Sequence, residues 1–505
     1  MNVRRVRALM TFLLCSGVVL PGCADSPPTS EFLPHVAGAE VVNVTCEDGT
    51  WGKGFYPGGG VDIREGESVD LGYPVGGKIS TIVCVPSDFP RFGDVWIGRW
   101  ATVSVMKNEA WRDILRSLLT GSDSTNPLTS EGKPAYYQLV VDPNGVIRHY
   151  AEGQGLPAAL EYNPVTGGLI GYQEGSETSP MGVPPTGGML LLHDTPPPKP
   201  GIPVTGRIAS ADPELRLDWH DYAVLPSGNV LVIGYQTVKE TPSTDVRLFR
   251  SVSGCPARIE DYRYTLRTRI VEYSPSGSQV RVWRSEDHFP PHAAVPVPVV
   301  LRTPGDGGEV CAIDVEHANA VDVTPDGEVI VGFRNSVFAA ALLTWPAGDV
   351  VWTLGGKGDR ALEVTKDPLG GPRASHDARI TRVGGQVYLH LLDNNSLRGP
   401  SRYVRYRVDS AARTAELVAN VDLECHGRPC YSIMMGSVSV LGEESDLAEV
   451  LANPGSVLGE DLTVYLEGVL LHYRGDDLVR EIRLGDWWAY RVVVLPREPW
   501  KSPNP

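Results

Sequence analysis

A short phrase, a glycine-containing turn followed by an apolar strand, recurs along this chain and restricts its possible folds more than any other feature. The full copies are Leu225-Pro-Ser-Gly-Asn-Val-Leu-Val-Ile-Gly234 and Thr324-Pro-Asp-Gly-Glu-Val-Ile-Val-Gly332, with shorter ones at 142–145, 274–277 and 383–389. The prolines at 226, 275 and 325 are 49 and 50 residues apart. Glycine supplies the positive φ of such a turn, and the strand behind it pairs with the strand before it. The pattern therefore predicts antiparallel sheets repeated at a fixed interval.

Repeats of this length are typical of one architecture. A period of roughly 40–50 residues, with about four strands in each repeat, indicates the blades of a β-propeller. Gly and Pro, 55 and 42 residues, separate short β-branched runs in most of the chain. We therefore predict an all-β fold in which residues 130–498 form a six-bladed β-propeller, the blade number being about what the length allows. A large array of β-sandwiches is the alternative, and the regular period disfavours it.

Residues 31–125 precede the repeats, and we expect them to form a separate small β-domain. Strand-like runs occur at 41–45, 78–85 and 94–106. Towards the end of this unit, residues 109–119 place apolar side chains at helical spacing and Gly121 follows, which predicts a short helix. The pattern also allows a second short helix at 445–451.

Residues 1–22 have the features of an export signal peptide. Arg4, Arg5 and Arg7 precede a 13-residue apolar stretch at 8–20, which is shorter than the roughly 20 residues that a membrane-spanning helix needs. Leu20-Pro-Gly-Cys23 follows and resembles the lipobox of bacterial lipoproteins. We therefore expect cleavage before Cys23, lipid attachment to Cys23, a tether over 23–30, and a membrane-anchored protein of the periplasm or cell envelope. Ala24 slightly favours the outer membrane, and an ordinary secretory signal cut nearby is the alternative.

The remaining cysteines and the net charge restrict the compartment and the partners. An even number of cysteines in an exported chain indicates disulfides. Their order along the chain suggests three pairs among several possible arrangements: Cys46 with Cys84, Cys255 with Cys311, and Cys425 with Cys430. The formal net charge is −16, so a nucleic-acid partner is not expected. A site for an anion must be built locally from Arg, His or backbone N–H groups.

Three histidines stand in comparable settings and are the candidates for chemistry. His220, His317 and His376 each precede or open a strand near a copy of the repeated phrase, and Arg334 ends the strand after His317. The inner strands of propeller blades face a central channel, so three blades would bring these histidines to one point. Three histidines also suit zinc. A guanidinium, however, binds a tetrahedral oxyanion and repels a cation, so we expect an anion site with no metal and no cofactor.

Several phrases around these residues, in their order along the chain, resemble one family. They are Asp218-Trp-His-Asp-Tyr222, His317-Ala-Asn-Ala-Val-Asp322, Val350-Val-Trp-Thr-Leu-Gly-Gly356, Ser375-His-Asp-Ala378, Leu392-Asp-Asn-Asn395 and Tyr490-Arg491. Residues 130–495 are in this respect similar to the bacterial arylsulfate sulfotransferases, six-bladed propellers that move sulfuryl groups between phenols. The resemblance implies a small-molecule aryl sulfate as donor, a phenol as acceptor, and no need for a nucleotide sulfate.

The resemblance also implies roles for five residues. His376 falls where the family keeps the histidine that takes the sulfuryl group, so a sulfohistidine intermediate is expected. His220, His317 and Arg334 fall on anion-binding and acid–base positions of the family. Asn319 lies beside them and is expected to bind substrate.

The chain departs from the family pattern at two of these positions. It has Ser375-His-Asp377 where characterised members have Gln-His-Thr, and Gly332-Phe-Arg334 where they have Ser-Ser-Arg. A non-catalytic propeller lipoprotein that acts as a surface binding module is therefore the alternative, and a sulfate-ester hydrolase is a third hypothesis. Asp377, and Asp221 beside His220, suit either a contact to an imidazole or the cap of a turn.

Overall fold

The computed structural model describes five strands before residue 87 and most of the chain from 96 to 500. The described residues are 41–43, 50–56, 59–64, 68–70, 80–86, 92, 96–107, 136–143, 145, 147–152, 160–173, 189–194, 204–245, 248, 254–302, 308–395, 399–432, 434–444, 447–458, 468–485 and 487–500. The export signal at 1–22, Cys23, the tether at 23–30 and the helix predicted over 109–119 lie outside them. The expected pairing of Cys46 with Cys84 also lies outside them, because Cys46 is not described.

Strands account for nearly all of the regular structure. In the N-terminal part, β1 (Val41–Asn43) pairs with β4 (Ser68–Asp70), and β2 (Thr50–Tyr56) lies between β3 (Gly59–Arg64) and β5 (Ser80–Pro86). All of these pairings are antiparallel. The strands lie within the small β-domain expected at 31–125, whose boundaries stay a prediction.

The first half of the remaining chain forms three sheets. The first has the order β38 (Trp487–Val494), β6 (Ala101–Lys107), β7 (Tyr136–Val141) and β8 (Ile147–Glu152). The second contains β9 (Glu161–Tyr162), β10 (Leu169–Gln173), β11 (Met189–His193) and β12 (Gly206–Ala209). The third contains β13 (Arg216–Val224), β14 (Val230–Val238), β16 (Thr265–Tyr273), β17 (Gln279–Arg284), β19 (Val297–Arg302) and β20 (Glu309–Asp314).

The second half forms one large and one small sheet. The large sheet starts with β21 (Ala318–Val323), β22 (Val329–Phe333), β23 (Phe338–Leu343) and β24 (Val350–Gly355). It continues through β25 (Ala361–Thr365) to β29 (Thr414–Asp422), β28 (Arg402–Asp409), β27 (Gln386–Asp393) and β26 (His376–Val383). The small sheet contains β33 (Ser437–Glu444), β34 (Leu447–Asn453), β36 (Val469–Arg474) and β37 (Asp477–Arg483).

Short elements complete the described structure. Three two-stranded pairs are β15 (Ser243–Thr244) with β18 (His292–Ala293), β30 (Glu424–Cys425) with β31 (Arg428–Pro429), and β32 (Tyr431–Ser432) with β35 (Val457–Leu458). Two 3₁₀ helices, η2 (Ile259–Asp261) and η3 (Ser285–Asp287), are the only helices among the described residues. The predicted all-β class is therefore confirmed.

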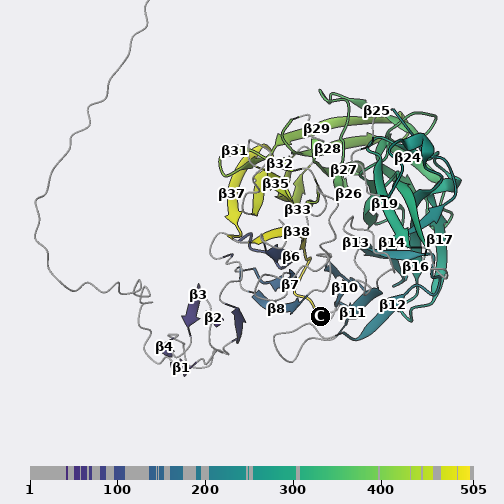
Figure 1. Ribbon diagram of the computed structural model, residues 1–505. Helices are drawn as coiled ribbons and strands as arrows, with labels where there is room; N and C mark the ends of the chain where they lie inside the picture. Colours follow the sequence, from purple (N-terminus) through teal and green to yellow (C-terminus); the bar gives the residue numbers. More distant parts are fainter. Residues whose placement is uncertain are drawn as a thin grey trace, which may run out of the picture.

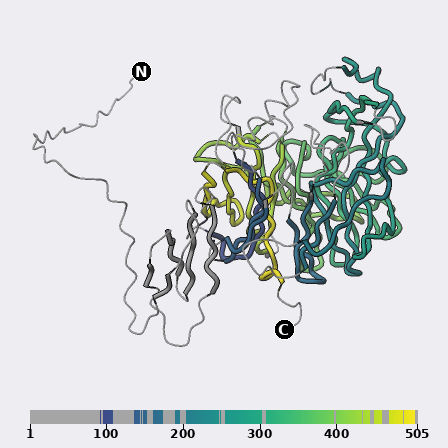
Figure 2. The backbone as a smooth tube through the Cα atoms, turned by 60° about the horizontal axis from the view of Figure 1, so that its bottom comes forward, coloured from purple at the N-terminus to yellow at the C-terminus, as the bar shows by residue number. Residues whose placement is uncertain are grey.

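The sheets are arranged around a common centre, as Figure 1 shows. Strands β13, β21, β26, β33 and β38 each contact the next in this order and form an inner ring. The yellow C-terminal end of the chain returns beside the blue strands of its first half in Figure 2, where β38 pairs with β6. This radial arrangement is propeller-like, and the number of six blades stays a prediction.

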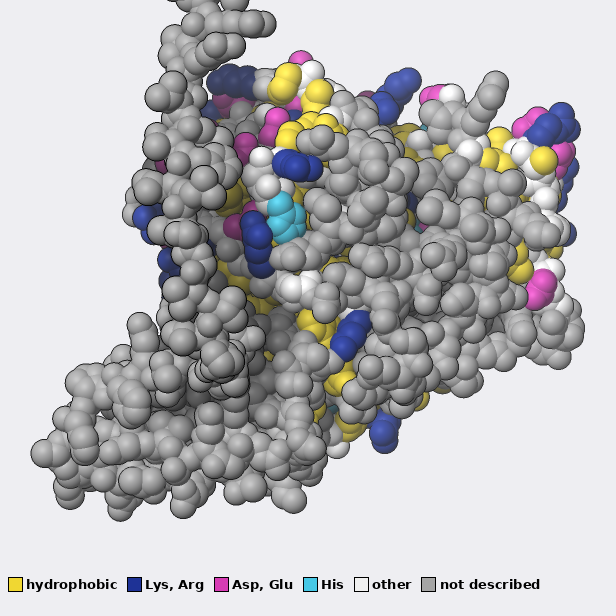
Figure 3. Space-filling view, turned by 60° about the vertical axis from the view of Figure 1, so that its left-hand side comes forward, with side chains coloured by type: hydrophobic (Ala, Val, Ile, Leu, Met, Phe, Trp, Pro, Cys, Tyr) yellow, Lys and Arg dark blue, Asp and Glu magenta, His cyan; other side chains and the backbone are white. Residues whose placement is uncertain are grey.

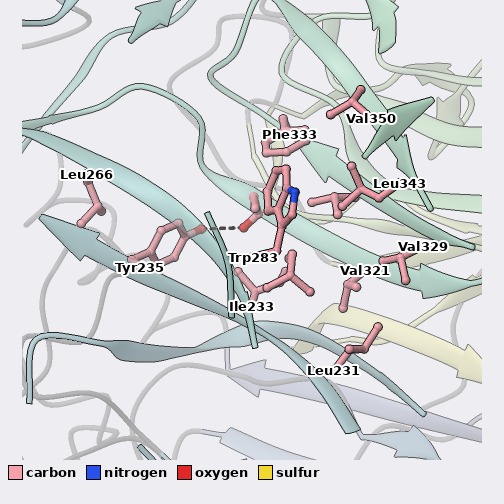
Figure 4. Packing of buried hydrophobic residues seen from close by; sticks show 14 of the residues in the cluster. Leu231, Ile233, Tyr235, Leu266, Trp283, Val321, Val329, Phe333, Leu343 and Val350 are labelled. Atoms are coloured by element: carbon pink, nitrogen blue, oxygen red, sulfur yellow. Dashed lines mark hydrogen bonds between the residues drawn. The ribbon is translucent and has the colours of Figure 1, made fainter. Parts of the chain in front are cut away.

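Apolar side chains are buried between neighbouring sheets, not in one central core. Figure 4 shows the layer between the sheet of β13, β14, β16 and β17 and the sheet of β21–β24, which contains Ile233, Leu266, Val329 and Leu343. In the same layer the Tyr235 hydroxyl donates to the carbonyl oxygen of Ala318 at 2.5 Å, so a sheet-to-sheet hydrogen bond accompanies the packing. On the face seen in Figure 3, the described basic, acidic and hydrophobic side chains are interspersed. Each sheet is thus held by its neighbours, which fixes the positions of the inner strands.

Two strands differ from the sequence-based expectations. We placed residues 94–106 in the N-terminal unit, whereas β6 is hydrogen-bonded between β38 and β7 and belongs to the ring. The buried side chains of Val103 and Val105 pack in one cluster with Leu470 and Ile482 of the neighbouring sheet. A strand's own sequence does not show which sheet it joins. Residues 447–453 form β34, not a helix. Val450 and Ala452 pack in one apolar cluster and Leu451 between them packs in another, so successive side chains point to opposite faces, as in a strand.

Two of the three expected disulfides are present. Cys255 is bonded to Cys311, which anchors the segment before β16 to β20, and Cys425 is bonded to Cys430 across the short β30–β31 pair. Within the described part of the chain, no helix has the length and apolarity needed to cross a membrane.

Candidate active site

The three candidate histidines occupy matching positions on inner strands. His220 lies within β13, His317 immediately precedes β21, and His376 opens β26. The pairing register of all three strands shifts at this point, within 217–222, 318–320 and 376–379, and the irregularity in β13 is longer than those in β21 and β26. A bulge re-aims side chains and is common beside active sites. These irregularities explain how the side chains leave the regular in-and-out alternation at one level of the ring.

His220 and His317 each have a carboxylate partner. The Nδ1 atom of His220 lies 2.5 Å from Asp218 Oδ1, and that of His317 lies 2.7 Å from Asp314 Oδ2. The centroids of the two imidazoles are 4.9 Å apart, edge to face. Asp314 Oδ1 also accepts the backbone N–H of His317 at 2.8 Å and holds it at a left-handed φ of 48°. Because the carboxylates engage Nδ1, the Nε2 atoms are left for chemistry.

His376 has an amide as its partner in place of a carboxylate. Its Nδ1 atom lies 2.6 Å from Asn394 Oδ1, while Asn394 Nδ2 donates to the Met435 carbonyl at 3.0 Å and to Ser432 Oγ at 3.1 Å. These contacts orient the amide so that Oδ1 is an acceptor and His376 Nδ1 carries the hydrogen. The lone pair is therefore on Nε2, which accepts the backbone N–H of Met435 at 3.1 Å.

Burial favours the neutral form of all three imidazoles. It lowers the pKa of His376 well below the usual 6.5, and the Arg334 guanidinium lowers this pKa further. Burial also lowers the pKa of His220 to about 3. The pKa of His317 is lowered by burial too, against the opposing effect of Asp314. Arg334 acts on the pKa of each of the three rings, so the structure brings the four predicted residues together.

Arg334 is held in place by its own strand. It follows β22, is 9% exposed, and donates its backbone N–H to the carbonyl of His317 at 3.0 Å. Its Nη1 atom donates to Asn335 Oδ1 at 2.9 Å. A guanidinium fixed in this way can donate paired hydrogen bonds to two oxygens of a tetrahedral anion.

Asn319 connects two of the inner strands. Its Nδ2 atom donates to the carbonyl of Ser375, the residue before His376, at 2.8 Å. Its own carbonyl oxygen accepts from Arg491 Nη2 at 3.0 Å. These contacts position the backbone that carries His376, and substrate binding by Asn319 stays a prediction.

Asp221 and Asp377 belong to a buried ion-pair belt together with Arg379 and Arg491. Asp221 lies 2.7 Å from Arg491 Nη1 and 2.9 Å from Arg379 Nη2, and Asp377 lies 2.6 Å from Arg379 Nη2. The two carboxylates also accept backbone N–H groups from the next inner strands, those of Val321 and Val438. Neither of the two roles considered from sequence describes them, because their charged partners are the buried guanidinium groups of Arg379 and Arg491.

Four residues of the site were not assigned from the sequence. They are Asp218, Asp314, Asn394 and Met435. The two aspartates precede their histidines by two and three positions, and this spacing could have suggested them. Asn394 and Met435 are 18 and 59 residues from His376, so no local pattern indicates their contacts.

The cluster has the groups that transfer of an anionic group requires. It offers a neutral imidazole with a defined lone pair, a second imidazole backed by a carboxylate for proton transfer, and a fixed guanidinium. No set of three or more His, Cys, Asp or Glu side chains in the described parts of the chain is arranged to hold a metal ion. The guanidinium beside the rings suits an anionic ligand.

Comparison with known proteins gives distant structural similarities and one family match. The chain is similar to an apocarotenoid oxygenase from Synechocystis (11% identity, TM-score 0.34, 78% of each chain covered). It is also similar to a putative 6-phosphogluconolactonase from Bacteroides uniformis (10%, 0.32, 78% of this chain and 99% of that one) and to AztD from Citrobacter koseri (10%, 0.30, 79% and 98%). No curated protein sequence matches the chain.

The family match covers most of the ring. A model of the arylsulfotransferase (ASST) family matches residues 118–460, more than half of the chain. This range contains the histidine cluster, Arg334 and the residues that hold His376 in place. The chain therefore belongs to the arylsulfotransferase family.

Proposed function

We propose that this protein transfers a sulfuryl group from an aryl sulfate to a phenolic acceptor through a sulfohistidine on His376. The observation that carries the proposal is the contact of His376 Nδ1 with the oriented amide of Asn394 at 2.6 Å, which puts the lone pair on Nε2. Burial and Arg334 lower the pKa of this imidazole, so it is neutral and nucleophilic near pH 7. Membership of the family supports sulfuryl transfer from aryl sulfates.

In the first half-reaction, Nε2 attacks the sulfur in line. The N–S bond forms while the bond between sulfur and the aryl oxygen breaks, and the electron pair of that bond leaves with the phenoxide. As in phosphoryl transfer, the transition state is loose and spreads charge over three equatorial oxygens, two of which Arg334 can bind. The hydrogen bond from the Met435 N–H to Nε2, 3.1 Å long, uses the same lone pair and must break as the N–S bond forms.

His317 is the better candidate for the proton transfers. Its carboxylate partner Asp314 opposes the effect of burial on its pKa, and the anionic donor adds a further charge that favours the imidazolium. Protonated His317 gives its proton to the departing phenoxide. In the second half-reaction neutral His317 takes the proton of the incoming phenol, whose oxygen attacks sulfur and returns the electron pair to Nε2. His220, whose pKa burial lowers to about 3, stays neutral and takes no part in the proton transfers.

Replacing His376 by Asn tests the proposal. With 4-nitrophenyl sulfate as donor and phenol as acceptor, His376→Asn should lower the release of 4-nitrophenol by at least about 10³-fold, as expected for loss of a nucleophile. His426→Asn is the control, since His426 lies in the β30–β31 turn at a left-handed φ of 55° that Asn adopts readily. Release at the wild-type rate by His376→Asn would contradict the nucleophile. Turnover of the donor with water alone would indicate a sulfate-ester hydrolase. Binding of the donor without any turnover would indicate a non-catalytic binding module.

We also propose that the chain works outside the cytoplasm, anchored through lipid on Cys23. The two disulfides, Cys255–Cys311 and Cys425–Cys430, support an oxidising compartment. Cys23→Ser should move the protein from the membrane fraction to the soluble fraction of the producing cell. Equal recovery of both forms in the membrane fraction would argue against the anchor.

A further inference from the structure

A cavity of about 930 Å³ opens beside the histidine cluster. Its wall is built from the junction of β22 and β23, the turn between β24 and β25, and the segment 369–375. Arg334 and Ser375 belong to this wall. Because Ser375 precedes His376, and the Arg334 guanidinium is close enough to lower the pKa of all three imidazoles, the cavity adjoins the position where the sulfuryl group would be transferred.

One side of the cavity is aromatic. The ring centroids of Phe289 and Phe338 are 4.5 Å apart, those of Phe333 and Phe338 are 5.1 Å apart, and all three residues line the cavity. Such a cluster offers ring faces and edges to another aromatic group, which gains from offset or edge-to-face contact. The wall nearest Arg334 is therefore suited to the hydrocarbon part of an aryl ester.

Two apolar side chains at the cavity are exposed without a visible structural reason. Val337 and Leu369 both line the cavity and are each 39% exposed. Exposed apolar side chains gathered at a concave surface indicate a binding site, whereas isolated ones on a convex surface are ordinary. The same cavity is also lined by exposed charged residues, Lys357, Asp359 and Arg360. They form the polar, solvent-exposed part of its entrance.

The size of the cavity selects among aryl substrates. Pockets of roughly 300–1,000 Å³ enclose ligands of drug size, so a cavity near the upper end is far larger than a single phenol ring needs. We propose that this cavity binds an extended aryl group of two or more rings, which makes polycyclic aryl sulfates and phenols the preferred substrates. This inference rests on the proposed function and names the substrate class of the same site.

The test compares a one-ring with a two-ring donor in variants of the cavity. Phenyl sulfate and 2-naphthyl sulfate serve as donors for the full chain, and binding of 2-naphthol is followed separately by its fluorescence. Val337→Asn and Leu369→Asn make the apolar rim polar, and Ala361→Phe fills space in the wall. Val351→Asn is the matched control, because Val351 is 37% exposed on β24 but does not line the cavity.

Each cavity variant should lower kcat/KM for 2-naphthyl sulfate by about tenfold, the size expected for a hydrophobic pocket, and weaken 2-naphthol binding by a similar factor. The same variants should leave kcat/KM for phenyl sulfate within about twofold of the wild-type value. Val351→Asn should leave kcat/KM for both donors within about twofold of the wild-type value. Equal losses for both donors, or no loss for either, would overturn the inference and leave sulfuryl transfer standing. If the protein turns over neither donor yet binds 2-naphthol in a manner sensitive to the cavity variants, the proposed function fails and the cavity assignment stands.

Discussion

His317 and His376 differ in chemistry because their Nδ1 atoms have different partners. A carboxylate, as Asp314 provides to His317, favours the protonated imidazole and makes that ring a proton carrier. An amide, as Asn394 provides to His376, fixes the tautomer without adding a charge. The nucleophile therefore keeps its lone pair on Nε2, and the carboxylate beside the acid–base residue allows that residue to hold a proton.

The role of Asn394 can be tested by removing its polar atoms. Asn394→Leu deletes the acceptor for His376 Nδ1 and the two donor contacts to Met435 and Ser432. The imidazole can then adopt the tautomer without a lone pair on Nε2, so the first half-reaction should slow by about 10²-fold or more. Stopped-flow measurement of 4-nitrophenol release gives the rate of this half-reaction. Because the role is one of positioning, KM for the donor should change little; a loss confined to KM would contradict it.

Burial of the neutral imidazoles should make folding stability depend on pH. Folded His220 has a pKa of about 3 against 6.5 for the ordinary group. Between these values the unfolded chain binds a proton that the folded chain does not, so stability falls as the pH falls through this window. His220→Gln should therefore lose less stability than wild type between about pH 7 and pH 5, by about 2 kcal/mol. Urea unfolding at both pH values measures it, and identical pH dependence of the two proteins would count against a buried neutral His220.

At the scale of elements, the site depends on strand irregularities and tight loops that cannot be recognised from the sequence. The register shifts in β13, β21 and β26 are defined by pairing with another strand, so a strand's own alternation cannot reveal them. The segment 447–453 shows the converse error, since short apolar runs fit either period. The packing of Val450 and Ala452 in one cluster and of Leu451 in another identifies the strand only in the folded sheet.

The loop that carries Met435 contains a glycine with no room for a side chain. At Gly436, with φ 110°, a Cβ atom would lie 2.1 Å from Leu392 Cδ2 and 2.6 Å from the Asn453 carbonyl oxygen. Gly358 has the same φ of 110° but open space around it. Gly358→Ala should therefore cost about 1–2 kcal/mol of backbone strain, and Gly436→Ala a further 1–3 kcal/mol or so for the forced displacement. Urea midpoints at unchanged m-value measure the difference, and equal costs would contradict the packing of this loop.

At the scale of the whole molecule, the ion-pair belt ties the ring together beneath the histidines. Arg491 on the C-terminal strand β38 contacts Asp221 on β13 and the carbonyl of Asn319 on β21. Together with the pairing of β38 with β6, these contacts join the two ends of the ring. The strands that carry the site residues are therefore held by the same residues that close the fold.

Removing one cation of the ion-pair belt should lower the free energy of unfolding. Arg491→Met leaves Asp221 and Asp377 buried with Arg379 as their remaining belt partner, and should lower the free energy of unfolding by about 3–5 kcal/mol. Arg483→Met is the control, because Arg483 pairs with Glu481 at the surface and its side chain is 61% exposed; its effect should be at most about 1 kcal/mol. Equal effects of the two substitutions would show that the belt does not hold the ring.

The sequence was sufficient for the all-β class and for the approach of His220, His317, His376 and Arg334, because both follow from a repeated local pattern. It was also sufficient for two disulfides, because their cysteines follow one another along the chain. It was insufficient wherever a residue's partner lies far away along the chain. Asn394, Met435 and the contacts of Asp221 and Asp377 with Arg491 are of that kind. The ring position of β6 is another, since it depends on pairing with a strand near the other end of the chain.

The most direct test of the proposed chemistry is to detect the sulfohistidine. The protein is incubated with an aryl sulfate without acceptor, kept at alkaline pH to preserve the N–S bond, digested and examined by mass spectrometry. The peptide containing His376 should gain the mass of one sulfuryl group in step with a single equivalent of released phenol, and should lose it when a phenol is added. Donor turnover with that peptide unmodified throughout, or modification of another residue, would contradict His376 as the carrier of the sulfuryl group.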